Sequence, residues 1–420
     1  MPRPIAISLS PNTEPDDIRR AWQTLLKPQA WKKPNVVDAL EKQLTKYLNN
    51  YSVAMVSSGR RALYDVMKAY DIGKHDEVIL QAFTCIAVPA AVQWTGATAV
   101  YADIDKSTLN LDLKSVENKI TSRTKAIIIQ HTLGIPGPVT ELAALARKKN
   151  IIFIEDCAHG FGATYQQQPL GTYGDAAIVS FGRDKTLSCI FGGAVISKNP
   201  KIIKAIRRHS ESLVAPPAQW IVQQLLHPIL MNAAVKLYFT AALGKIFLVA
   251  MQKLGLLSKA VAPQEKTGEK PVHFSYRFSP ALGQLLELQL SKLDRYTLRR
   301  RQIARRYMQA LADIPGIKMA GLPADLSTEA LAKAGGLRFP VFVQNPDKMR
   351  KAAQREKIIL GDWYDTPLAP PDALPEKFGY APGSCPVAEE TARNIVNLST
   401  YPLMTDGQVE KVIRFVKAHV

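Results

Sequence analysis

The stretch Ile151–Gly193 begins IIFIEDCAHGFGA, continues through GTYGDAAIVSFGRDKTLS and closes on CIFGG. It holds two short apolar runs rich in β-branched residues, at 151–154 and 176–179. Runs of this length, bounded by glycine and polar residues, predict two fully buried β-strands. Buried strands of this kind are typical of a parallel sheet covered by helices on both faces.

Polar residues follow both predicted strands. Asp156 and His159 come after the first, and Ser180 and Lys185 come after the second. In open α/β sheets the ligand lies beyond the carboxyl ends of the strands, so we expect these four side chains to share one site. A lysine that can form a Schiff base, with a carboxylate that can pair with a pyridinium nitrogen, suits pyridoxal phosphate. Each residue taken singly is more often structural, and the combination favours the cofactor.

Composition places the chain among soluble globular proteins. With 420 residues it can hold a large core and two domains. No two of its four cysteines form a CxxC pair, which argues against a disulfide framework and against a metal site and favours a reducing cytoplasm. The N-terminus lacks the apolar segment of a signal peptide. The cysteines are Cys85, Cys157, Cys189 and Cys385.

The net charge of +18 predicts anionic partners. Phosphorylated substrates and an anionic membrane surface both fit this charge, as does a solvated basic surface with no partner. No RNA- or DNA-binding motif accompanies the charge, so nucleic acid is not expected as a partner.

A second candidate for the site lies near the N-terminus. A predicted strand at 53–56 is followed by Ser58, Gly59, Arg60 and Arg61 and then by a helical pattern. A strand, a small-residue turn and a helix N-terminus can hold a phosphate through free backbone N–H groups. The alternative is a capped helix start with two exposed arginines.

Further strands alternate with helical patterns along the first half of the chain, at 77–80, 100–104 and 125–130. This alternation predicts an α/β domain with a mainly parallel central sheet. The second half mixes a strand at 337–343 with helices and predicts a smaller α+β domain at the C-terminus. We expect one long helix over 280–311, with its arginine-rich part at 298–306 on an exposed face.

We predict four parts along the chain. An N-terminal arm and a large cofactor-binding domain span 1–215, and an apolar helical insertion spans 216–257. A polar linker follows at 258–271, and the small C-terminal domain spans 272–420. The insertion has three interpretations: helices packed on the domain or at a subunit interface, a helix pair lying on a membrane through 216–254, or a membrane span. The first is favoured and the last is the weakest.

Several motifs together resemble the DegT/DnrJ/EryC1/StrS family of sugar aminotransferases. They are SSGRRAL, HDEVILQAFTCIAV, GATAVYADID, RTKAIIIQHTLGIP, IEDCAHGFGA, GDAAIVSFGRDKTLSCIFGGAVIS and NLSTYPLMTDGQVEKVI. Their order and spacing cover nearly the whole chain. The resemblance implies the aspartate-aminotransferase fold, known as fold type I, and pyridoxal 5'-phosphate as the cofactor.

The resemblance also implies catalytic roles for three residues. Lys185 matches the Schiff-base lysine, and Asp156 matches the aspartate that pairs with the pyridine nitrogen. His159 matches the residue that lies against the ring and its phenolic oxygen. An ionised Asp156 keeps the ring nitrogen protonated, and a lysine that has lost its proton can attack and later move a proton between substrate and cofactor.

The phosphate-binding positions match less closely. Ser180 matches a phosphate-binding hydroxyl, and Ser58, Gly59 and Arg60 fall where the family binds the phosphate, although Arg60 replaces a common threonine. Cys85 stands where an aromatic residue often stacks on the ring, so Phe83 or another ring would have to stack instead. Ser275 replaces an asparagine that reaches the phosphate of a neighbouring subunit.

The resemblance predicts a homodimeric aminotransferase with its site at the subunit interface. It would convert a keto-sugar on a nucleoside diphosphate to an amino-sugar, with glutamate as donor. The apolar insertion motivates a variant in which the sugar is lipid-linked and the protein lies at the inner face of the membrane. The alternatives are a pyridoxal-phosphate sugar dehydratase, which the presence of Lys185 disfavours, and a regulator that keeps the fold without turnover.

Overall fold

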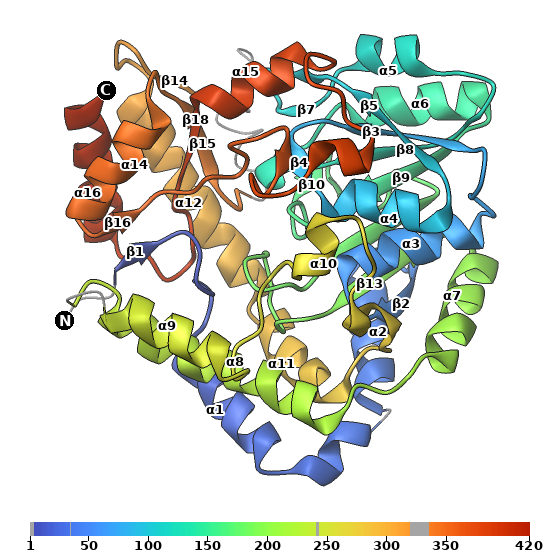
Figure 1. The fold of residues 1–420 in the computed structure, drawn as a ribbon, viewed down its shortest axis with the longest axis horizontal. Coiled ribbons are helices and arrows are strands. Elements are labelled where there is room, and N and C mark those ends of the chain that lie inside the picture. The colour runs from blue at the N-terminus through green and yellow to red at the C-terminus, as the bar shows by residue number, and fades with distance from the viewer. Residues whose placement is uncertain (1–3, 34, 241–242, 320–335) are drawn as a thin grey trace.

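A computed structural model describes residues 4–33, 35–240, 243–319 and 336–420 (Figure 1). Its centre is a seven-stranded sheet in which β13 runs antiparallel to β2 and β12 and the other neighbouring strands are parallel. The predicted mainly parallel α/β sheet is confirmed. In spatial order the strands are β2 (Ser52–Val56), β13 (Gly193–Ser197), β12 (Ala176–Ser180), β9 (Ile152–Asp156), β8 (Thr124–Gln130), β3 (Glu77–Gln81) and β5 (Thr98–Ala102).

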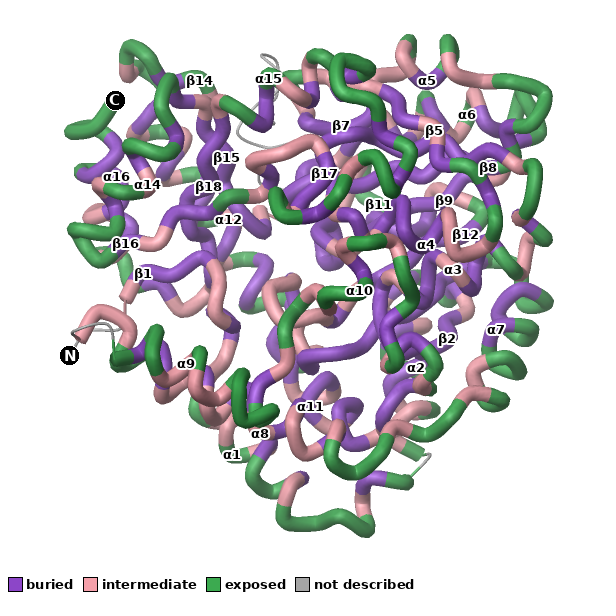
Figure 2. The backbone as a smooth tube through the Cα atoms, viewed as in Figure 1, coloured by how far each residue is buried: buried purple, intermediate pink, exposed green. Residues whose placement is uncertain are grey.

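Alternate residues of each strand enter cores on opposite faces of the sheet. In β2, Ala54 and Val56 pack with one core, whereas Val53 and Met55 pack with the other. Helices α3 (Gly59–Ala69), α4 (Ala87–Thr95) and α7 (Pro200–Ser212) cover the first face. Helices α2 (Asn35–Tyr47), α5 (Leu113–Lys119), α6 (Val139–Lys149) and α11 (Pro280–Leu290) cover the second. Both strand faces are therefore buried (Figure 2), which is why the strands read as continuous apolar runs.

A smaller α+β unit follows, as predicted. Its antiparallel sheet has the order β14 (Lys318–Met319), β15 (Phe339–Phe342) and β18 (Ile395–Leu398). Helices α12 (Leu293–Leu311), α14 (Pro346–Arg355) and α16 (Asp406–His419) pack against this sheet around a separate core. Short elements complete the fold: β4 (Thr84–Cys85), β6 (Ile104–Asp105), β7 (Asn110–Leu111), β10 (Thr164–Tyr165), β11 (Gln168–Pro169), β17 (Leu368–Ala369) and α15 (Pro386–Asn394).

The single long helix predicted over 280–311 is wrong, because the chain turns between α11 and α12. At the turn, Lys292 is only 5% exposed, and its ammonium lies 2.9 Å from Glu14 and 2.6 Å from Asp16, at the start of α1 (Pro15–Leu25). This ion-pair cluster ties the turn to the N-terminal helix. The predicted exposed arginine face is wrong for Arg300, which is 1% exposed and donates to Asn12 Oδ1 at 2.8 Å.

The N-terminal arm crosses between the two units. Its strand β1 (Ile5–Ala6) pairs in parallel with β16 (Ile358–Ile359) of the C-terminal unit. Ile5 is 3% exposed and belongs to the core of that unit. The predicted large domain, residues 1–215, includes the arm. In the structure the first strand of the arm, β1, belongs to the small C-terminal unit.

The apolar insertion forms two helices, α8 (Ala218–Leu237) and α9 (Leu243–Lys253). Helix α8 packs against α1 and α9 and lies between them in the lower part of Figure 1. Within the described ranges, no helix combines the length and the apolar character needed to cross a bilayer. Of the three interpretations, the span therefore has no support.

The segment predicted as a polar linker contains a short helix, α10 (Pro263–Lys266). Within it Glu265 is 2% exposed, so this segment is packed against the domain. Its neighbours Ala260 and Val261 line the cavity described below.

Candidate active site

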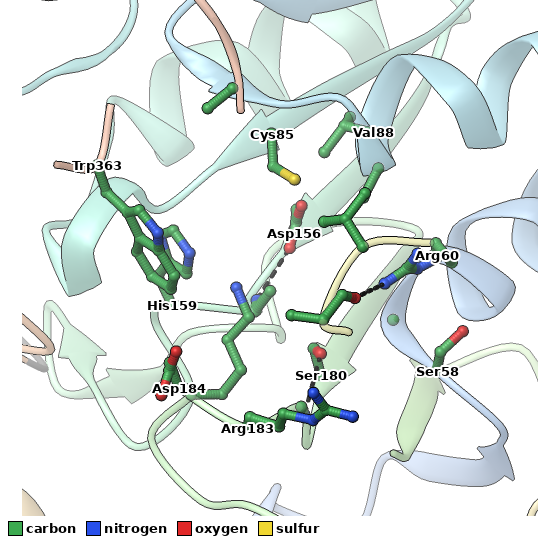
Figure 3. A pocket seen from close by; sticks show the side chains of 18 of the residues that line it. Ser58, Arg60, Cys85, Val88, Asp156, His159, Ser180, Arg183, Asp184 and Trp363 are labelled. Carbon is green, nitrogen blue, oxygen red and sulfur yellow. Dashed lines mark hydrogen bonds between the residues drawn. The ribbon is translucent and has the colours of Figure 1, made fainter. Parts of the chain in front are cut away.

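A cavity of about 290 Å³ opens at the carboxyl ends of β9 and β12 (Figure 3). Its lining includes every site residue predicted from the sequence except Ser275, which is exposed and outside the cavity of its own chain. The predicted residues in the lining are Ser58, Gly59, Arg60, Cys85, Asp156, His159, Ser180 and Lys185.

Asp156 is the last residue of β9 and points into the cavity. Its Oδ1 accepts a hydrogen bond from the Ala158 amide at 2.9 Å, and the residue is 3% exposed. Burial raises the pKa of Asp156, while the charge of Lys185 opposes this shift. A cationic ring nitrogen beside Asp156 would oppose it further. The preceding Glu155 faces away and accepts from backbone amides at 171, 173 and 174, so it is structural.

Lys185 lies in the turn between β12 and β13. Asn12 Nδ2 donates to the carbonyl of Lys185 at 2.9 Å and to that of Thr186 at 3.0 Å, which fixes the turn. Burial lowers the pKa of the Lys185 amine, and the charges of Cys85 and Asp156 partly offset the shift. A lowered pKa increases the fraction of neutral amine, the form that can attack a carbonyl carbon.

His159 is fixed on two sides. Its Nδ1 accepts from the Leu133 amide at 3.2 Å, and its Nε2 lies 3.5 Å from the Tyr364 hydroxyl. Burial, followed by the charge of Lys185, lowers the pKa of His159 well below the usual range, so the ring is neutral at pH 7. The Trp363 indole stacks on it, with ring centroids 4.8 Å apart and planes 11° apart (Figure 3).

The N-terminus of α3 forms a cradle opposite these groups. Ser58 caps the helix by accepting the Arg61 amide at 3.2 Å, and the first amides of the helix have no partner within it. A Cβ on Gly59 would lie 2.8 Å from Ser180 Cβ, so only glycine allows the helix start to approach this strand end so closely. The Ser180 hydroxyl accepts the Gly182 amide at 3.3 Å and lies in the same cradle.

Arg60 does not present a free charge to the cradle. Its guanidinium forms an ion pair with the buried Glu265 and donates to the Ala260 carbonyl at 3.3 Å. The alternative of two exposed arginines is also wrong, because the side chains of Arg60 and Arg61 are 14% and 3% exposed. Arg61 forms an ion pair with Asp65, in which Arg61 Nε lies 2.8 Å from Asp65 Oδ2.

These groups fit pyridoxal phosphate. A buried carboxylate, an amine of lowered pKa and a neutral imidazole face a cradle of backbone amides with a hydroxyl, as an aromatic cation with a phosphate requires. Phe83 cannot supply the missing stacking ring directly, because it is fully buried against Tyr364 with centroids 5.4 Å apart. The aromatic residues of the lining are instead Phe191, Trp363 and Tyr364.

Sequence reasoning missed the part of the cavity contributed by the C-terminal region. The run GDWYDTPLAPP, after β16, lines the cavity with residues at 362–365 and 369–371. Strand β17 in this run pairs with β4, which brings it beside Cys85. The sequence signal for this part of the cavity is the high density of aromatic and acidic residues in the run GDWYDTPLAPP.

Comparison with known proteins agrees with this geometry. The profile of the DegT/DnrJ/EryC1/StrS aminotransferase family matches residues 12–417. The chain belongs to this family. It is an aminotransferase that depends on pyridoxal phosphate.

Family relatives include the spore coat polysaccharide biosynthesis protein SpsC of Bacillus subtilis (strain 168), 28% identical over 96% of this chain and 94% of that protein. The GDP-perosamine synthase of Escherichia coli O157:H7 is 35% identical over a shorter region, 40% of this chain and 46% of the synthase. The crystal structure of NtdA from Bacillus subtilis with bound PMP has the same fold, with a TM-score of 0.74, 20% identity and coverage of 99% of this chain and 85% of that one.

Proposed function

We propose that this aminotransferase converts a keto-sugar carried on a nucleoside diphosphate to an amino-sugar, with glutamate as donor. The observation that carries the proposal is the convergence of Lys185, Asp156 and His159 on one cavity with the Gly59 cradle. The GDP-perosamine synthase and SpsC relatives support a sugar substrate. The net charge of +18 suits an anionic diphosphate.

Each residue has a physical role in this proposal. The bound cofactor supplies an aromatic cation that accepts electron density from the substrate carbon. Asp156 stabilises the positive charge on the ring nitrogen, and the Gly59 amide with the Ser180 hydroxyl binds the phosphate. Lys185 would hold the cofactor through its amine and, as a free amine, would serve as the base that accepts and returns the substrate proton. Neutral His159 would contact the cofactor ring without adding a second cation beside Lys185.

Visible absorbance of the purified protein tests the cofactor roles. Wild type loaded with pyridoxal phosphate should absorb in the visible, and Lys185→Ala should lack the lysine-dependent band. Glutamate with a panel of keto-sugar nucleotides, followed by mass spectrometry, should give an amino-sugar nucleotide with wild type only. A protein that takes up no pyridoxal phosphate would contradict the proposal and leave the regulator interpretation.

We also propose a homodimer in which Ser275 reaches the partner's site. Ser275 is exposed and does not line the cavity of its own chain, and its carbonyl accepts the Val214 amide at 3.3 Å. Mixing Lys185→Ala with Ser275→Ala would then form dimers with one site lacking both changes. Their activity should exceed that of either variant alone, and no gain on mixing would refute the shared site.

A membrane-surface location is the second part of the proposal, and it implies a cytoplasmic protein held at the inner face. Helix α9 exposes apolar side chains: Ile246 is 62% exposed, Val249 52% and Leu243 48%. No acidic residue lies between Glu211 and Glu265, whereas lysines occur at 236, 245, 253 and 259. An exposed apolar face beside lysines suits an anionic lipid surface, and it motivates the variant in which a lipid diphosphate replaces the nucleoside diphosphate as the carrier of the sugar.

Sedimentation with anionic liposomes tests this location. Wild type should bind, and Ile246→Glu with Val249→Glu should abolish binding. Leu298→Glu, an exposed apolar residue on α12, is the matched control and should bind as wild type does. If the double variant instead dissociates a dimer and leaves liposome binding unchanged, this face is a subunit interface.

A further inference from the structure

Helix α8 of the insertion buries two polar side chains among apolar ones. Gln224 is fully buried and His227 is 4% exposed, whereas the other residues that α8 buries are apolar. A polar group loses its contacts with water on burial, which costs free energy unless it gains hydrogen bonds within the protein. The partners of these two side chains therefore show what the buried face of α8 holds. Both sets of partners lead to the turn that carries Lys185.

Gln224 holds the residue two positions before Lys185. Its Oε1 accepts a hydrogen bond from the Ser258 hydroxyl at 2.9 Å and lies 3.5 Å from Nη2 of Arg183. The Arg183 guanidinium also donates to the carbonyl and the hydroxyl of Ser258. Burial lowers the pKa of Arg183 to about 10, so this side chain is a cation at neutral pH. Loss of an acceptor would leave part of a buried charge unbonded, which is costly.

His227 holds the residue immediately before Lys185 through one intermediate. Its Nε2 lies 3.0 Å from the Ser10 hydroxyl, and the Ser10 amide donates to Asp184 Oδ1 at 3.2 Å. Burial, followed by the charge of Arg183, lowers the pKa of His227 well below the usual range, so the ring is neutral at pH 7. Arg183 and Asp184 both line the cavity (Figure 3). The two residues that precede the reactive lysine are thus both connected to α8.

Lys185 lies in the middle of a long connection between two strands. Strand β12 ends at Ser180 and β13 begins at Gly193. The amide of Lys185 donates to the Gly182 carbonyl at 3.3 Å, a bond that closes only a short part of this connection. Connections of this kind are more mobile than the strands they join unless other groups hold them. The position of the lysine amine therefore depends on the side chains that hold its neighbours.

We propose that Gln224 and His227 are positioning residues for Lys185, and that the insertion serves the reaction by holding the two residues that precede this lysine. The inference rests on the proposed function, because it takes Lys185 as the amine that holds the cofactor and acts as the base. A reactive group must point at the atom it attacks, and a displacement of about 1 Å can cost about 100-fold in rate. An insertion that only contacted a surface or a second subunit would need no polar side chains on its buried face.

The rate at which the full chain, freed of cofactor, takes up pyridoxal phosphate tests the inference without a sugar substrate. The appearance of the visible band that Lys185→Ala lacks measures the attack by the lysine amine. Gln224→Leu removes the acceptor of Ser258 and Arg183 at similar volume, and it should slow this step about 10- to 100-fold. His227→Phe should slow it as well. Gln224→Glu keeps an acceptor oxygen and should retain most of the wild-type rate.

The pH dependence of uptake is a second readout, and a loss of stability alone would not move it. The titratable and charged groups that act on the Lys185 amine are Cys85, Asp156, Asp184 and Arg338. The variants change none of them. A turn released by Gln224→Leu lets water reach the amine, so the pKa of Lys185 should rise toward its ordinary value. The uptake profile should then shift toward alkaline pH.

Two further variants guard the test. Gln219→Leu, the same change at an exposed position of α8, is the matched control and should take up the cofactor as wild type does. Ser258→Ala removes the hydroxyl between Gln224 and Arg183 without altering α8. It therefore tests the same connection if a change within the helix prevents folding, and it should slow uptake in the same direction.

The outcomes separate this inference from the proposed function. Unchanged rates and pH profiles in Gln224→Leu, His227→Phe and Ser258→Ala would overturn the inference, as would a loss of stability in urea with uptake unchanged. If these variants slow uptake while wild type transaminates no keto-sugar nucleotide, the sugar assignment fails and the positioning role stands. A wild type that takes up no pyridoxal phosphate would overturn both.

Discussion

The guanidinium of Arg60 forms a buried ion pair with the carboxylate of Glu265, which joins the start of α3 to the segment that lines the mouth of the cavity. Ser258 joins the same segment to the turn after β12 through its contacts with Arg183. Arg60 stands where a threonine is common in the family, and its side chain instead holds the segment around Glu265 in place. We expect the Arg60 side chain to serve this connection, while its backbone amide remains available to the phosphate.

Breaking that pair should cost stability. Arg60→Thr leaves the Glu265 carboxylate buried without its cation, and we expect unfolding in urea to show a loss of about 3–5 kcal/mol. Arg60→Thr combined with Glu265→Gln should recover most of it, because no unpaired charge then remains. Equal losses in the single and double variants would show that the pair is not the cause.

The rate of pyridoxal phosphate uptake should rise with pH. Burial lowers the pKa of Lys185, so the reactive neutral amine forms at lower pH than in a free lysine. Asp156 opposes this lowering, so Asp156→Asn should shift the pH profile further toward acid even though it impairs turnover. Stopped-flow absorbance measures both profiles, and a shift of the variant toward alkaline pH would disprove this coupling.

Glu14 should make part of the folding free energy sensitive to acid. Burial alone raises its pKa, but hydrogen bonds from Arg295 and Lys292 outweigh burial and lower the pKa to about 2. The contribution is therefore complete above the unfolded-state pKa and is lost as the pH falls toward 2. Glu14→Gln should destabilise the protein by about 1–3 kcal/mol at pH 7 and flatten the acid limb of the stability curve. Glu117→Gln, an exposed change on α5, should do neither.

Gly59→Ala should weaken cofactor binding. The added methyl group would lie 2.8 Å from Ser180 Cβ, so α3 and β12 must move apart at the cradle. We expect a loss of about 1–3 kcal/mol in stability and a loss of about tenfold in pyridoxal phosphate affinity, measured by urea unfolding and by absorbance titration. Gly407→Ala, with open space around its Cβ, is the control.

The sheet and half of the cavity could be predicted because the information is local. Each parallel strand is buried on both faces, so its apolar run shows in the sequence, and the polar residue that ends it, such as Asp156 or Ser180, is marked by the end of the run. The contributions of Trp363 and Tyr364 could not be predicted in this way. They lie outside the main sheet, and tertiary packing alone brings them to Lys185.

Two other errors have the same origin. The turn at Lys292 interrupts a continuous helical pattern because its ammonium pairs with carboxylates far away in the sequence. Arg300 is in an arginine-rich run typical of an exposed face, yet Asn12 binds it in the interior. Charged residues with partners distant in sequence cannot be told from solvated ones by pattern alone.

The N-terminal arm contacts three parts of the molecule. It starts in the small unit at β1, passes the residue beside the reactive lysine, where the Ser10 amide donates to Asp184 at 3.2 Å, and contacts α8, where the Ser10 hydroxyl lies 3.0 Å from His227. Hydrogen bonds of Ser10 therefore link α8 to the turn that holds Lys185, and the backbone of the arm links Ser10 to the small unit. Attachment of α8 and α9 to a surface would therefore also restrain the turn that carries Lys185.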